Sequence, residues 1–93
     1  LDVRANTRLE FLCCTNNFIK ELDVSQNRFL SRLYCYGNSL RTLDLKNNPY
    51  LESLHCGANE WDYIDLRNNR SLEELTILRE QIDLLEGEII ASA

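Results

Sequence analysis

The sequence predicts a solenoid of short coils that stack with parallel strands. The first observation is an internal repeat of 21 residues: residues 22–42 (LDVSQNRFLSRLYCYGNSLRT) align with residues 1–21 before them and 43–63 after them. The second is that apolar residues alternate with others over a few positions in each half of the unit, which is strand periodicity. The third is that each half ends at an asparagine, a residue that favours sharp turns.

Each unit therefore reads as strand, turn, strand, turn, which makes about one coil of a flattened superhelix. One half of the unit follows the pattern L-x-x-L-x-C-x-x-N-x-L, as at Leu30, Leu33, Cys35, Asn38 and Leu40. The other half follows L-D-V-x-x-N, as at residues 22–27. The predicted organisation is one repeat domain over residues 1–93, with repeats at about 1–21, 22–42, 43–63 and 64–84 and a C-terminal cap or tail at 85–93.

The end of the chain has two interpretations, and both cover residues 71–90. In the first, the repeat continues: a strand runs through about Leu78, and Glu86 stays in register with Asp65. In the second, a short helix caps the solenoid, because Ser71 with Glu74 forms a capping box and apolar residues recur at helical spacing. We favour the strand. Either element would cover an open sheet edge.

Asparagines and cysteines recur at inward positions of the coils. The asparagines are expected to be structural, because a stack of side-chain amides can satisfy the backbone groups that a corner turns away from water. Cys14, Cys35 and Cys56 recur once per repeat on an inward column. A disulfide needs β-carbons closer than the strand spacing, and zinc needs four converging ligands. We therefore expect a row of reduced, buried cysteines that act as small apolar residues.

These motifs resemble leucine-rich repeats, and the full unit resembles their 21-residue subclass with nested periodicity, over residues 1 to about 72. The resemblance implies a right-handed, β-rich superhelix, with a parallel sheet on the concave face and short strands or turns on the convex face. It also implies that exposed concave residues bind protein. Members of this subclass are mostly bacterial and often secreted or surface-displayed, so the resemblance suggests that localisation without establishing it.

The outward positions of the concave strands supply the candidate binding residues: Phe11, Arg32, Tyr34, Tyr36 and His55. Aromatic residues and arginine anchor protein interfaces because they bury much area for little lost freedom. The competing interpretation is that these aromatics only pack on one another across strands. A Cys13–His55 catalytic pair is not expected, since two coils separate them and Tyr34 lies between. The sequence predicts no enzyme and no catalytic residues.

The opposite face carries a column of acids at Asp2, Asp23, Asp44 and Asp65. Such a row could suggest calcium ligands. Two residues further on, however, stand Arg4, Ser25, Lys46 and Arg67, which are expected to neutralise most of the column in exposed ion pairs. The sequence thus predicts no metal site and no cofactor.

The expected partner is a protein of unknown identity. A formal net charge of −5 argues against a nucleic-acid backbone, and no apolar run is long enough for membrane insertion. The chain starts inside a repeat, so we expect a fragment of a longer protein, and its uncapped edge could support self-association. The alternative function is a structural solenoid segment of a larger surface or secreted protein whose binding site lies in other repeats.

Overall fold

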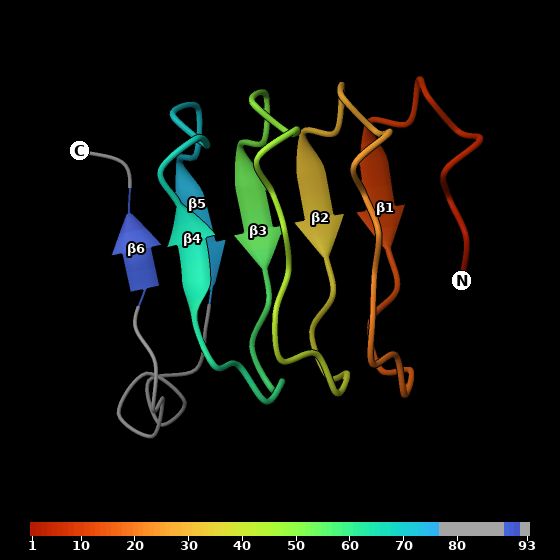
Figure 1. The fold of residues 1–93 in the computed structure, drawn as a ribbon, viewed down its shortest axis with the longest axis vertical. Coiled ribbons are helices and arrows are strands. Elements are labelled where there is room, and N and C mark those ends of the chain that lie inside the picture. The colour runs from red at the N-terminus through yellow and green to blue at the C-terminus, as the bar shows by residue number, and fades with distance from the viewer. Residues whose placement is uncertain (77–88, 92–93) are drawn as a thin grey trace.

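A computed structural model describes residues 1–76 and 89–91, which form a stack of coils with two parallel sheets (Figure 1). The larger sheet has the order β1-β2-β3-β5 and the smaller one pairs β4 with β6. The strands are β1 (Phe11–Cys13), β2 (Arg32–Tyr34), β3 (Ser53–His55), β4 (Ile64–Leu66), β5 (Glu74–Thr76) and β6 (Ile89–Ala91). Among these residues there is no helix, so none long and apolar enough to cross a membrane.

The four-stranded sheet forms on the L-x-x-L-x-C half of each repeat. Its register pairs Leu12 with Leu33, Leu33 with Leu54, and Leu54 with Leu75, so partners are 21 residues apart in sequence. Leu33 and Leu54 are fully buried. Because side chains alternate across a strand, burying the central leucine turns both flanking residues outward. The exposed side of β1-β2-β3-β5 is called the sheet face below.

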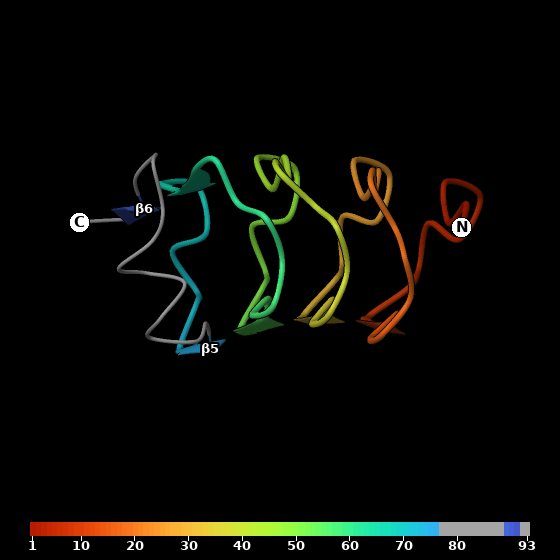
Figure 2. The same ribbon diagram turned by 90° about the horizontal axis from the view of Figure 1, so that it is seen from below.

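The two sheets occupy opposite sides of the coils, and the core lies between them (Figure 2). Seventeen buried apolar residues form one cluster that runs through the coils, and Trp61 at 4% exposure is its largest member. The Trp61 indole N–H donates to the Cys56 carbonyl at 2.7 Å, so its polar atom is satisfied inside the core. These features confirm the predicted solenoid.

The second half of the repeat differs from the strand-turn-strand-turn expectation. Only the fourth copy forms a strand there, β4, and its partner is β6. The equivalent segments 22–24 and 43–45 are not strands, although their apolar residues are buried as the alternation predicts. The alternation of apolar and polar residues predicts which side chains are buried. It does not predict whether the backbone of one coil forms strand hydrogen bonds with the next.

The C-terminal stretch follows the strand interpretation at its first described end, and a further strand that was not predicted lies at the second. Residues 74–76 form β5, where the capping helix would have begun, and residues 89–91 form β6. The register is corrected: Asp65 pairs with Ile90 rather than Glu86, so β4 and β6 are offset by 25 residues instead of 21. Leu75 pairs with the buried Leu54 in the register but is itself 37% exposed. The predicted strand end at Leu78 lies outside the described residues.

Buried asparagines join consecutive coils by hydrogen bonds. The Asn48 side-chain amide donates to the carbonyls of Val24 and Asn27 at 3.0 and 2.9 Å. Asn27 and Asn69 repeat this pattern one coil before and one coil after. In the other column, Asn38 donates to the Cys14 and Cys35 carbonyls and accepts from the amide of Asn17. The side-chain N–H groups thus donate to inward carbonyls at the corners, whereas the Oδ1 atoms of Asn27, Asn48 and Asn69 have no hydrogen-bond partner among the described residues.

The turn after each sheet strand passes through the left-handed region of backbone conformation. Asn16, Gly37 and Ala58, one per coil, have φ values of 57°, 75° and 51°. Asparagine and glycine tolerate this conformation well. Asn47 and Asn68, in the turns of the other half of the repeat, have negative φ.

Candidate functional site

The predicted binding residues gather on the sheet face because of the register. Cys13, Tyr34 and His55 stand side by side on β1, β2 and β3, and Phe11 is level with Arg32. The Phe11 and Tyr34 rings meet edge to face, with centroids 5.0 Å apart, and the Tyr34 and His55 rings stack at 4.2 Å. A continuous row of three rings therefore crosses three coils.

Arg32 and Tyr36 flank this row at its two sides. The Arg32 side chain is exposed and makes no hydrogen bond or ion pair within the described residues. Tyr36 follows β2 and is 36% exposed, and its carbonyl accepts from the Asn16 amide at 2.8 Å. The structure thus brings all five predicted residues to one side of the coils.

His55 also has an acidic partner that the sequence analysis did not identify. Its Nε2 atom contacts the Oε1 atom of Glu74, and the Ser53 hydroxyl donates to the same oxygen at 3.2 Å. The His55 hydrogen bond, followed by the bond from Ser53, lowers the pKa of the Glu74 carboxyl. The repeat could have indicated this contact, because Glu74 occupies the same outward column as Ser53, on the strand next to that of His55.

The cysteines lie where the sequence placed them. Cys13 is exposed on the sheet face, and the Thr15 backbone amide and hydroxyl lower the pKa of its thiol. Cys14, Cys35 and Cys56 are free and buried. Burial raises the pKa of the Cys35 thiol, and it raises that of Cys56 to about 12. Tyr34 stands between Cys13 and His55 in the register, so no thiol–imidazole contact forms.

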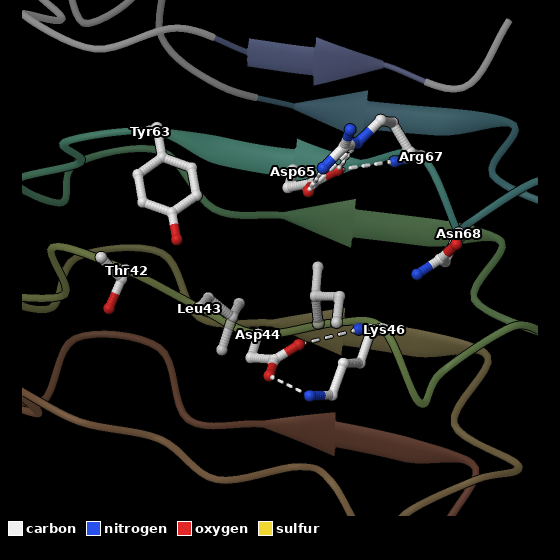
Figure 3. Close-up of a pocket in the computed structure, with 9 residues that line it drawn as sticks. Thr42, Leu43, Asp44, Lys46, Tyr63, Asp65, Arg67 and Asn68 are labelled. Atoms are coloured by element: carbon white, nitrogen blue, oxygen red, sulfur yellow. Dashed lines mark hydrogen bonds and ion pairs between the residues drawn. The ribbon is translucent and has the colours of Figure 1, made fainter.

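The face opposite the sheet holds the acids and their cationic neighbours. A cavity of about 370 Å³ lies on that face. Among the residues that line it, Asp44 pairs with Lys46 and Asp65 pairs with Arg67 (Figure 3). Asp65 also accepts from the Arg67 amide, and these bonds lower the pKa of its carboxyl. The paired carboxylates agree with the predicted ion-pair face. Within the described residues, no three metal-ligating side chains cluster.

Two surface contacts were missed by sequence reasoning. Arg41 pairs with Asp62 across one coil at 2.7 Å, and the only signal was opposite charge in residues 21 apart. Phe29 and Tyr50 stack with centroids 6.1 Å apart, and each ring is about half exposed. Phe29 and Tyr50 lie in the turns before β2 and β3, so they form a second aromatic surface apart from the outward positions of the sheet.

No protein-family model matches the chain, and no curated protein matches it either. Among solved structures, the chain is similar to the functional domain of InlJ from Listeria monocytogenes, a domain described as including a cysteine ladder. The likeness has a TM-score of 0.81 and 34% identity, and it covers 83% of this chain. The chain spans 17% of the length of that InlJ chain. Together with the parallel sheet and the repeat register, this match shows that the chain has a leucine-rich-repeat solenoid fold.

Proposed function

We propose that this chain is a protein-binding module that takes its partner on the sheet face. Leucine-rich-repeat folds generally mediate protein–protein interaction. The observation that carries the choice of face is the row of touching rings formed by Phe11, Tyr34 and His55 on a hydrogen-bonded sheet. A partner that covers this row would bury aromatic area whose conformation is already restricted, so little side-chain freedom is lost on binding.

The ring contacts also bear on the competing interpretation, in which the aromatics serve only to pack on one another. Tyr34 and His55 are half-buried, so part of their surface is already used within the fold. Phe11 keeps 49% of its surface exposed and Tyr36 keeps 36%. With the unpaired Arg32 beside them, these side chains leave both apolar area and a charged hydrogen-bond donor for a partner.

The test is capture of a natural partner by the immobilised chain from an extract of the source organism. Replacing both Tyr34 and Tyr36 with alanine is expected to abolish capture of the partner protein that the unmodified chain captures. The matched control is Phe29→Ala with Tyr50→Ala, which removes an aromatic pair from outside the sheet face and should leave capture intact. If the tyrosine variant retains the partner and the control loses it, the binding face is wrongly assigned.

A structural segment of a longer solenoid is the second candidate function. The observation in its favour is that the chain matches only 17% of the length of the InlJ chain to which it is similar. In that case the binding site lies in other repeats. Capture by a longer version of the protein, but not by residues 1–93, would favour this candidate, whereas equal capture by both would favour the sheet face.

We further propose that the chain belongs to the 21-residue nested-periodicity subclass, as one repeat domain of a secreted or surface-displayed bacterial protein. The 21-residue register of the sheet and the likeness to a Listeria protein support this proposal. Neither a catalytic role nor nucleic-acid binding is proposed, because Tyr34 separates Cys13 from His55 and the net charge is acidic. Fractionation of the source organism with an antibody to the chain tests the localisation.

A further inference from the structure

The sheet face is hollowed at the starts of β2, β3 and β5. The cavity there has a volume of about 480 Å³, enough for a long side chain of a bound partner. It is lined by one tyrosine, one serine and four charged residues: Arg32, Tyr34, Glu52, Ser53, Glu73 and Glu74. The row of touching rings therefore borders a polar recess.

The charge in this recess is unbalanced. Three carboxylates face one guanidinium, and Glu74 is already engaged by His55 and Ser53. Glu52 and Glu73 stand on neighbouring coils, joined by a backbone hydrogen bond of 2.9 Å. Both side chains are exposed, and within the described residues neither forms an ion pair. Like charges on adjacent strands repel, so a cation between them would relieve this repulsion.

On the opposite face, three of the four aspartates of the acidic column are neutralised within the chain. There Asp2, Asp44 and Asp65 each pair with a cation two residues further along. Asp44 and Asp65 also line a cavity that includes a tyrosine, so the difference lies in charge: within the described residues, Glu52 and Glu73 have no cation of their own. Tyr34 supplies an aromatic ring, and a cation held against an aromatic face gains further electrostatic attraction.

We propose that the sheet face binds a basic segment of a partner protein, with a lysine or arginine side chain of that segment in the recess between Glu52, Glu73 and the ring of Tyr34. This inference rests on the proposed function and adds the partner's charge to it. The net charge of −5 attracts such a segment at long range. Arg32 lines the same recess and opposes a cation, so the attraction depends on the two unpaired glutamates.

The experiment uses three blocked nonapeptides in which threonine alternates with lysine, glutamine or glutamate. Each is titrated into the 93-residue chain while backbone amide signals are followed by NMR. The lysine peptide is expected to shift the amides of residues 32–36, 52–55 and 73–76 saturably, and the glutamate peptide should leave them unmoved. Raising NaCl from 0.05 to 0.5 M should weaken binding, because the charges of the recess are exposed to salt.

Replacing both Glu52 and Glu73 with glutamine should lower the affinity for the lysine peptide about fivefold or more. The matched control, Glu21→Gln with Glu60→Gln, makes the same change in net charge at exposed sites outside this recess and should leave affinity within about twofold. Trp61 fluorescence checks that both variants fold. Equal weakening in both variants would overturn the proposal, because the attraction would then follow net charge alone.

Two other outcomes would also overturn it. If the glutamine peptide binds the sheet face as tightly as the lysine peptide, the partner's charge is wrongly assigned while the binding face stands. If no peptide shifts these amides, or all shifts fall on the opposite face, the recess does not take a basic side chain. The proposed function is decided separately by partner capture with the Tyr34 and Tyr36 variant, so the two failures are distinguishable.

Discussion

Replacing Asn48 with alanine should remove about 2 kcal/mol from the free energy of unfolding. The side chain is fully buried and donates two hydrogen bonds, each of which contributes about 1 kcal/mol net. Its acceptor atom, Oδ1, has no partner, so nothing further is lost with it. The Val24 and Asn27 carbonyls also accept turn hydrogen bonds from backbone amides and therefore keep one partner each. The loss in free energy of unfolding should therefore stay close to about 2 kcal/mol.

The measurement is equilibrium unfolding in urea, followed by the fluorescence of Trp61, which is the chain's single tryptophan and is buried in the same coil as Asn48. For a domain of this size, the loss corresponds to a fall in melting temperature of about 8–16 °C. The control is Asn6→Ala, in the same column but exposed, which should change stability by less than about 0.5 kcal/mol. If the free energies of unfolding of the two variants differ by less than about 0.5 kcal/mol, the buried side-chain amides do not hold the coils together.

Three further predictions follow from local geometry. Gly37→Ala should destabilise the fold in urea, because the residue has a φ of 75° and a β-carbon there would lie 2.2 Å from the Asn16 side-chain oxygen; equal stability would contradict this. A thiol reagent should label Cys13 alone in the native chain and all four cysteines in urea, as counted by mass spectrometry. The pKa of Glu74 is lowered from 4.5, so its stabilisation is present above that pH and is lost as pH falls through the folded-state pKa. Urea unfolding between pH 5 and 3 should therefore show a smaller loss of stability in Glu74→Gln than in the parent chain, and equal losses would contradict this.

The fold of the sheet half could be predicted from sequence because its determinants recur once per coil. Leu12, Leu33 and Leu54 are identical residues at a constant spacing, and a stack of coils is the arrangement that buries them all. The fourth copy could not be predicted in the same way. Its pattern weakens after Leu72, and the four extra residues between β4 and β6 place Ile90 where the repeat would have placed Glu86.

The sequence predicted which residues of the candidate site point outward, but it did not predict which of their side chains touch. Alternation is enough to place Tyr34 and His55 outward on neighbouring strands. Whether their rings stack, and whether His55 reaches Glu74, depends on side-chain rotamers that no spacing specifies. The recess beside Tyr34 was missed for a related reason, since Glu52 and Glu73 flank the strands and were not counted among the outward positions.

The fold constrains the inward column of the sheet more tightly than the outward column beside it. The inward column is leucine in all four strands, whereas the outward column beside it reads Phe11, Arg32, Ser53 and Glu74. The sheet's hydrogen bonds join backbone atoms, so they do not depend on the identity of these outward residues. The coils could therefore stack with other side chains at these positions. The proposed contact with a partner is a requirement on these positions that lies outside the fold, and it acts beside the contacts that Phe11 and Glu74 make within it.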